Sequence, residues 1–180
     1  AAEGPKEEGA DRMLALMRSA PAWVVRSVDV APRRKSAPPP FITSTLQQAA
    51  SSAMGFSANQ TMQTAQQLYE GVELSAGPVG LITYMRTDSV AIAREAQAAA
   101  RAYIEKTYGR DYVPEKPNFF RSKANAQGAH EAIRPTDVNL TPDSVKRFLS
   151  PAQYKLYTLI WRRFVACQMA PAQLENTTAT

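Results

Sequence analysis

The sequence has very few of the side chains that build disulfides and metal sites. Among its 180 residues there is one cysteine, Cys167, and one histidine, His130. A single cysteine excludes an internal disulfide and a zinc site with several thiolate ligands. Apolar runs are also short, because none approaches the ~18 residues that a membrane-spanning helix needs. These absences predict an intracellular, soluble protein with no membrane partner.

The common catalytic sequence motifs are missing as well. We find no P-loop, no dinucleotide-binding glycine fingerprint, no HExxH or CxxC motif and no Ser-His-Asp pattern. The sequence therefore offers no support for the enzyme classes that these motifs mark.

Charge is spread unevenly along the chain. The 21 Lys and Arg residues exceed the 16 Asp and Glu residues, and the net charge of +5 permits a polyanionic partner without proving one. Residues 41–69 carry no charge at all. Neutral side chains can bind phosphate oxygens and base edges, but an uncharged segment is equally expected where other parts of a larger protein enclose it. The polar residues expected on its exposed faces are Thr43, Ser44, Gln47, Gln48, Ser51, Ser52, Gln63, Thr64, Gln66 and Gln67.

Capping signals predict a helical hairpin in this uncharged stretch. Ser44 with Gln47, and Ser57 with Gln60, have the spacing of N-terminal capping boxes. Gly55 follows the first apolar face and is expected to end the first helix. Two helices joined by a few residues form the frame on which helix-turn-helix motifs are built.

The regions on either side of the hairpin are expected to be more varied. Residues 22–30 are rich in β-branched side chains and predict a strand, whereas residues 31–40 predict a basic, proline-rich linker. A short strand is expected at 79–85. A helix should follow at about 90–108, with its N-cap among residues 87–89.

Two cap-then-proline pairs mark later helices. Thr141-Pro142 and Ser150-Pro151 are typical helix starts, and the second predicts a helix to about Gln168. Its inward side chains should be Tyr157, Ile160, Trp161 and Phe164. The last residues resemble a strand that stops in mid-run, which indicates a fragment of a longer protein.

The segment from Gly80 to Ser89 places reactive groups in an unusual order. Tyr84 and Arg86 are two residues apart, so alternation along a strand puts both on one face. The helix expected to follow would aim free N–H groups at the same region. A tyrosine is a poor nucleophile at neutral pH, but a nearby guanidinium stabilises both its phenolate and a phosphoryl transition state. A phosphate therefore fits, although a core tyrosine beside a surface arginine has the same spacing.

A second polar segment ends at Pro135 and is expected to be partly extended. It contains His130, beside a carboxylate, and Arg134. Histidine can donate to a phosphate or move a proton, while a loop histidine next to a surface ion pair is the alternative. Upstream, Lys123 fits either a phosphate contact or a solvated loop charge.

These segments resemble a known family. Residues 80–89 look like the active-site tyrosine segment of type IA DNA topoisomerases, and residues 129–135 look like that family's second active-site segment. Residues 38–51 resemble the start of the domain that carries both, and residues 159–169 resemble its end. The methionine after the tyrosine and the string His-Glu-Ala-Ile-Arg-Pro are most similar to the bacterial topoisomerase I branch.

The resemblance implies roles for individual residues. Tyr84 would attack a phosphodiester of single-stranded DNA and become a 5′-phosphotyrosine; another strand would pass, and the 3′-hydroxyl would reverse the linkage. Arg86 would stabilise the transition state and His130 would hold a phosphate. Arg134 and Thr83 are weaker supporting candidates, and Lys123 and Gln47 are candidate DNA contacts by their chemistry. Such an enzyme relaxes negatively supercoiled DNA without ATP.

The implied fold is mainly α. A helical domain with a helix-turn-helix-like hairpin and short active-site strands would cover residues 38–170. Residues 1–37 and 171–180 would be β segments at the edge of an adjoining β-rich arch domain.

The resemblance also defines what lies outside this sequence. The family's TOPRIM domain, which binds Mg²⁺, has no counterpart here, so we expect no metal on this chain and no activity from it alone. The expected partners are DNA, single-stranded at the cleavage site, and the other domains of the same enzyme, at the bacterial nucleoid in the cytoplasm. The alternatives are a non-catalytic, helix-turn-helix-type DNA-binding module and a scaffold domain.

Overall fold

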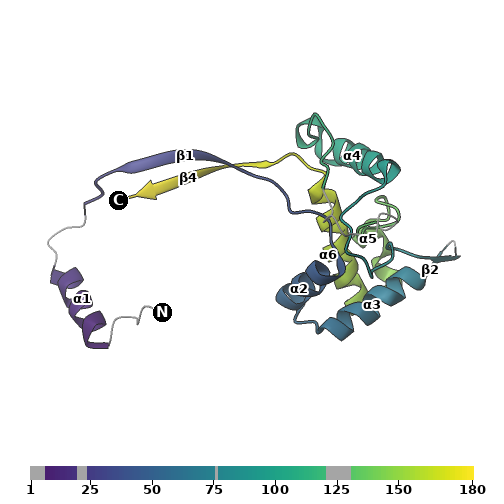
Figure 1. The fold of residues 1–180 in the computed structure, drawn as a ribbon, viewed down its shortest axis with the longest axis horizontal. Helices are drawn as coiled ribbons and strands as arrows, with labels where there is room; N and C mark the ends of the chain where they lie inside the picture. The colour runs from purple at the N-terminus through teal and green to yellow at the C-terminus, as the bar shows by residue number, and fades with distance from the viewer. Residues whose placement is uncertain (1–6, 20–23, 76, 121–130) are drawn as a thin grey trace. The chain divides into compact units, whose positions relative to one another are not determined.

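The computed structural model describes residues 7–19, 24–75, 77–120 and 131–180. The chain divides into two units, which are described separately (Figure 1). Unit 1 comprises Ala1–Arg33 and Gln173–Thr180, and unit 2 comprises Arg34–Ala172. The assignment of the chain ends to an arch domain stays a prediction.

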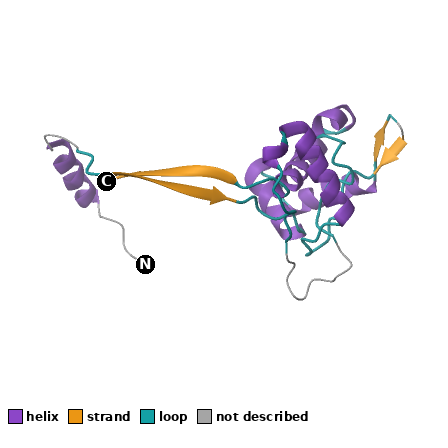
Figure 2. Cartoon of the chain, turned by 90° about the horizontal axis from the view of Figure 1, so that it is seen from above, coloured by secondary structure: helices purple, strands orange, loops and turns teal. Residues whose placement is uncertain are grey.

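Unit 1 contains helix α1, Glu7–Ser19, and most of a two-stranded ribbon (Figure 2). Strand β1, Val28–Lys35, pairs with β4, Ala172–Ala179. The linker expected at 31–40 was therefore wrong in its first half, because β1 continues through Pro32 to Lys35. Each strand of a two-stranded ribbon has an open edge, and there a proline without an N–H group is tolerated.

Unit 2 is built around helix α6, Pro151–Cys167, which contacts four other helices. These are α2 (Thr43–Met54), α3 (Ala58–Glu70), α4 (Arg94–Tyr108) and α5 (Pro142–Val145). Single 3₁₀ turns lie at Arg110–Tyr112 and Lys146–Phe148, and β2 (Val72–Leu74) pairs with β3 (Gly77–Val79). The expectation of a mainly α fold is confirmed. No helix within the described ranges is long and apolar enough to span a membrane.

The core of unit 2 forms on the predicted face of α6. Tyr157, Ile160, Trp161 and Phe164 are all buried, as expected. The Tyr157 hydroxyl donates to the Leu140 carbonyl (2.6 Å), and the Trp161 indole N–H donates to the Val138 carbonyl (2.9 Å). The polar ends of these aromatic side chains thus tie the loop before α5 to the core.

Most predicted helix ends are correct. The Ser57 hydroxyl accepts from the Gln60 N–H (3.1 Å), and Gly55 ends α2 in the left-handed conformation, with φ 69°. Thr141 and Ser150 cap α5 and α6 as expected. The α2–α3 hairpin therefore exists, and a helix-turn-helix function for it stays a prediction.

Two expectations for the hairpin were wrong. Helix α2 begins at Thr43 rather than after Ser44, because Thr43 is bonded to a distant segment described below. Thr64 is 6% exposed rather than on the surface. Its hydroxyl donates to the Gln60 carbonyl one turn earlier (2.8 Å), which satisfies it inside the fold.

The region between the hairpin and α4 also differs from expectation. Instead of a strand at 79–85, β3 ends at Val79 and only Ile82 forms a bridge, to Pro135. Helix α4 starts at Arg94, not near residue 90. The Thr87 and Ser89 hydroxyls each accept from the N–H two residues later (3.1 Å in both cases), and such local turns compete with helix formation.

Candidate active site

Tyr84 lies on an extended segment whose side chains alternate between surface and interior. Tyr84 is 42% exposed and Arg86 is also exposed, whereas Met85 and Thr87 are buried. The phenol and the guanidinium are therefore both accessible, although this segment belongs to no sheet and its backbone bends at Met85.

Thr83 joins the segment to the second polar motif. Its N–H donates to the Arg134 carbonyl (2.9 Å). Its hydroxyl donates to the Ala132 carbonyl (2.7 Å) and accepts from the Arg134 N–H (3.0 Å). These bonds bring the two motifs side by side and hold the backbone just before Tyr84.

Thr43 holds the backbone just after Tyr84. Its hydroxyl donates to the Met85 carbonyl (2.7 Å) and accepts from the Thr87 N–H (2.9 Å). Its own N–H donates to the Thr87 carbonyl (3.0 Å). The helix whose N-terminus lies near Arg86 is therefore α2, which corrects the expectation that the following helix would supply that partial positive charge.

Tyr69, near the end of α3, contacts the Tyr84 ring. The two rings meet edge to face with their centroids 5.3 Å apart. The Leu81 N–H donates to the Leu68 carbonyl (2.7 Å), which holds the segment against α3. Gly80 permits this approach, because a Cβ there would lie 2.6 Å from the Tyr69 carbonyl oxygen.

Tyr69 was not identified from the sequence as part of the site, and Gly80 was recognised only as the first residue of the tyrosine segment, with no role assigned. The β2–β3 hairpin lies in the sequence between Tyr69 and the segment that begins at Gly80. The sequence of this hairpin does not indicate that Tyr69 and Tyr84 meet. A glycine after a β-hairpin can be required for several reasons, such as a tight turn or a close contact. The reason at Gly80 becomes clear only from the position of the Tyr69 carbonyl oxygen in the structure.

Arg86 lies between two surface hollows. One is formed with Asp88 and the first turn of α2, including Gln47. The other runs along α3 and is lined mainly by neutral polar side chains, namely Asn59, Gln63, Gln66 and Gln67, together with Met62 and Glu70. The structure therefore brings Arg86 and Gln47 to the same hollow, and Tyr84 precedes Arg86 by two residues.

The remaining candidates divide into two groups. His130 and Lys123 lie outside the described residues. Arg134 is described, with its side chain 12% exposed: Nε contacts a Glu131 carboxylate oxygen (2.6 Å) and Nη1 donates to the Pro135 carbonyl (3.0 Å). The guanidinium of Arg134 and the hydroxyl of Thr83 thus already have partners within the protein.

Known proteins match this chain along nearly its whole length. A family model described as DNA topoisomerase matches residues 3–180. The chain belongs to the DNA topoisomerase family. This confirms the resemblance found in the polar segments around Tyr84 and Arg134.

Individual topoisomerases show how much of the protein is represented. DNA topoisomerase 1 of Helicobacter pylori strain J99 is 53% identical over 156 residues, which cover 86% of this chain and 21% of that protein. DNA topoisomerase 1 of Rickettsia conorii is 57% identical over 132 residues, 73% of this chain and 17% of that protein. The chain therefore spans about a fifth of the length of these relatives.

A solved structure supports the same assignment. Full-length topoisomerase I from Thermotoga maritima superposes with a TM-score of 0.79 and 45% sequence identity, covering 93% of this chain and 26% of that one. The mainly helical unit, with its small ribbons, is therefore a fold found within a bacterial topoisomerase I.

Proposed function

We propose that this chain is the tyrosine-bearing part of a type IA DNA topoisomerase that relaxes negatively supercoiled DNA. The observation that carries the proposal is an exposed Tyr84 on a backbone held from both sides, by Thr83 and Thr43, with Arg86 beside it. A fixed backbone around an accessible side chain suits a nucleophile that must meet a substrate in a defined geometry.

The proposed reaction keeps the energy of the broken DNA phosphodiester in a bond between phosphate and tyrosine. The Tyr84 phenol oxygen attacks a phosphorus of single-stranded DNA, and the bond from phosphorus to the 3′-oxygen breaks. The phenol proton passes to a base outside this chain, and the leaving 3′-oxygen takes up a proton from an acid outside this chain or from water to become a hydroxyl. The released 3′-hydroxyl reverses the exchange after a second strand has passed. Arg86 stabilises the charge on the phosphoryl oxygens in the transition state. A phosphotyrosine replaces a phosphodiester, so ATP is not needed.

Other residues take supporting roles in this proposal. His130 and Lys123 contact phosphates, and Gln47 offers a neutral contact in the hollow beside Arg86. Thr83 and Arg134 position the two motifs, because their side chains are bonded within the protein. Thr83 and Arg134 would therefore influence DNA cleavage indirectly, through the position of the Tyr84 backbone.

Mg²⁺ is implied by the family resemblance, and the described residues do not fit it. Among them, no group of three or more Asp, Glu, His or Cys side chains could hold a metal ion. We propose that the metal is bound by a TOPRIM domain of the parent enzyme and that the isolated chain neither cleaves nor relaxes DNA.

A complementation experiment tests this function. The chain is mixed with a separately made TOPRIM-bearing piece of the same enzyme, Mg²⁺ and a 3′-labelled single-stranded oligonucleotide, and docking of the two pieces is verified by sedimentation. Label that migrates with this chain after denaturation, and that disappears in Tyr84→Phe, supports the proposal. Docked pieces that form no adduct would favour a non-catalytic DNA-binding module instead.

A further inference from the structure

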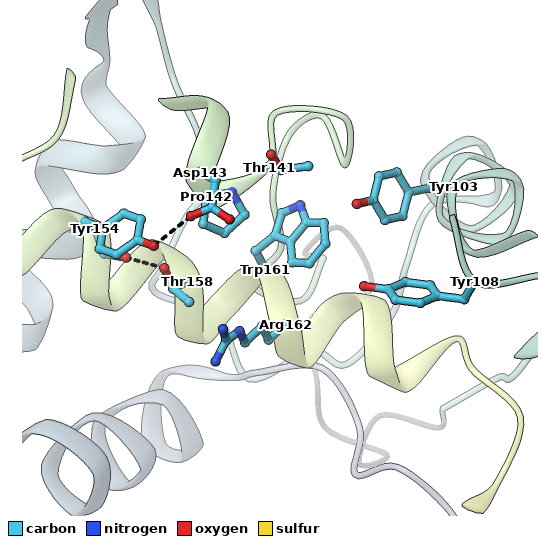
Figure 3. A pocket seen from close by; sticks show the side chains of 9 residues that line it. All are labelled: Tyr103, Tyr108, Thr141, Pro142, Asp143, Tyr154, Thr158, Trp161 and Arg162. Atoms are coloured by element: carbon cyan, nitrogen blue, oxygen red, sulfur yellow. Dashed lines mark hydrogen bonds between the residues drawn. The ribbon is translucent and has the colours of Figure 1, made fainter. Parts of the chain in front are cut away.

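A third hollow in unit 2 shares no lining residue with the two beside Arg86. It has a volume of about 270 Å³ and lies between α4, α5 and α6 (Figure 3). Its aromatic and charged lining residues are Tyr103, Tyr108, Asp143, Tyr154, Trp161 and Arg162. The volume is at the small end for ligand pockets and suits one flat ring system better than a larger molecule.

Aromatic rings form a continuous row into this hollow. Tyr103 meets Trp161 edge to face with centroids 5.4 Å apart, and its other neighbour is Tyr108 at 6.4 Å. Tyr112 extends the row, 6.0 Å from Tyr108. Trp161 is buried, but Tyr108 is 44% exposed and Tyr112 53% exposed. The outer end of the row therefore presents open ring surface to solvent.

Some polar groups that line the hollow have no partner among the described residues, and one already has a partner. In Figure 3 the hydroxyls of Tyr103 and Tyr108 point toward Trp161, and neither has a hydrogen-bond partner among the described residues. Arg162 is exposed and forms no ion pair within the described ranges. Asp143 is the acidic residue of the lining, and its Oδ1 accepts from the Tyr154 hydroxyl (2.9 Å).

The helical spacing explains why four residues of α6 line this hollow. On α6, Tyr154, Thr158, Trp161 and Arg162 stand at i, i+4, i+7 and i+8, which is one face of a helix. Arg162 thus lies on the same face of α6 as Trp161, the buried end of the aromatic row. Open aromatic surface and an unpaired guanidinium in one hollow are a combination that suits single-stranded nucleic acid, with bases stacked on rings and phosphates at the cation.

We propose that this hollow binds an unpaired base of single-stranded DNA, stacked on Tyr108, with a flanking phosphate at Arg162. The inference rests on the proposed function for its partner, DNA, but it uses none of the residues around Tyr84. The strand would be held at a second place on unit 2.

Photo-crosslinking tests this site directly. The 180-residue chain is irradiated with a single-stranded oligonucleotide that carries 5-iodouracil, and the crosslinked peptides are identified by mass spectrometry. A crosslink at Tyr108 or Tyr103 is expected. In a binding titration Tyr108→Ala should weaken affinity about tenfold, whereas Tyr108→Phe, which keeps the ring, should bind almost normally.

The salt dependence of binding tests the cation. Arg162→Ala should weaken binding and reduce the slope of log affinity against log salt by about 0.7, the value for one phosphate contact on a single strand. Phe119→Ala and Arg94→Ala are matched controls, because both side chains are exposed and neither lines the hollow. Their affinities should equal that of the parent chain.

Two results would overturn the site. Crosslinks that map only to other peptides would do so, and so would a Tyr108→Ala chain that binds as tightly as the parent. Thermal unfolding of each variant guards against misfolding, and the crosslink map of the unaltered chain keeps the test valid if Tyr108→Ala is unstable. The adduct at Tyr84 is a separate readout, so either proposal can fail while the other stands.

Discussion

The ring of Tyr69 meets the ring of Tyr84 edge to face, with 5.3 Å between their centroids. Both residues are about two-fifths exposed, at 41% and 42%. This contact limits the orientations of an otherwise accessible phenol. It connects the end of α3 to the proposed nucleophile.

Removing the Tyr69 ring should slow adduct formation. In the complementation assay, Tyr69→Ala is expected to lower the rate several-fold, because the Tyr84 ring then samples more unproductive orientations. Tyr69→Phe keeps the edge contact and should react normally. Equal rates for Tyr69→Ala and the parent chain would show that the contact has no orienting role.

Adding a methyl group at Gly80 should destabilise the fold. The new Cβ of Gly80→Ala would lie 2.6 Å from a backbone oxygen of Tyr69, and relieving such overlap typically costs about 1–3 kcal/mol. Urea unfolding measures this loss. Gly55→Ala is the comparator: nothing lies within 4 Å there, and φ is 69°, so its cost of about 1–2 kcal/mol comes from the backbone alone. A Gly80→Ala chain as stable as the parent would contradict the close approach.

The Thr83 hydroxyl should contribute measurably to stability. Thr83→Val keeps the shape but leaves the Ala132 carbonyl and the Arg134 N–H without this partner, which should cost about 1–3 kcal/mol. Thr83→Ser retains the hydroxyl and should lose less. Equilibrium unfolding gives both values, and amide hydrogen exchange at Arg134 should accelerate in the valine variant alone. Unchanged exchange there would exclude the linking role.

Cys167 should make stability depend on pH in the alkaline range. Burial raises the pKa of its thiol from 9.0 to about 12. The unfolded chain therefore loses the thiol proton first, so the contribution is complete below pH 9 and is lost as pH rises toward 12. Between pH 9 and pH 10 the free energy of unfolding, measured in urea, should fall by about 1 kcal/mol less in Cys167→Ala than in the parent chain. Parallel slopes would contradict a buried, protonated thiol.

The sequence predicted helix ends and the buried face of α6 correctly, because interactions between residues close in the sequence determine both. Ser57, Thr141 and Ser150 cap their helices because each hydroxyl reaches an N–H three residues later. The inward face of α6 follows from helical period alone. Tyr84 and Arg86 are both exposed and Met85 between them is buried, but the strand expected there does not form and the backbone bends at Met85, so a common face for the two side chains stays a prediction.

The errors arise where distant segments meet. Thr43 starts α2 and bonds to Met85, 42 residues away in sequence, and no local pattern announces that pairing. The same holds for Thr83 with Ala132 and for Tyr69 with Tyr84. Thr87 and Ser89 looked like helix caps because their side chains suit that role, but they form turns before α4 instead.

The two anchors beside Tyr84 have a mechanical consequence. A force applied at the phenol oxygen enters the backbone between Thr83, tied to residues 132–134, and Met85, tied to Thr43. The Ile133 N–H in turn donates to the Phe41 carbonyl (2.8 Å). The segments around Phe41, Tyr84 and Ile133 are therefore each bonded to the other two. Tension on the phenol is therefore shared by α2 and the segment around Ile133 instead of falling on one loop alone.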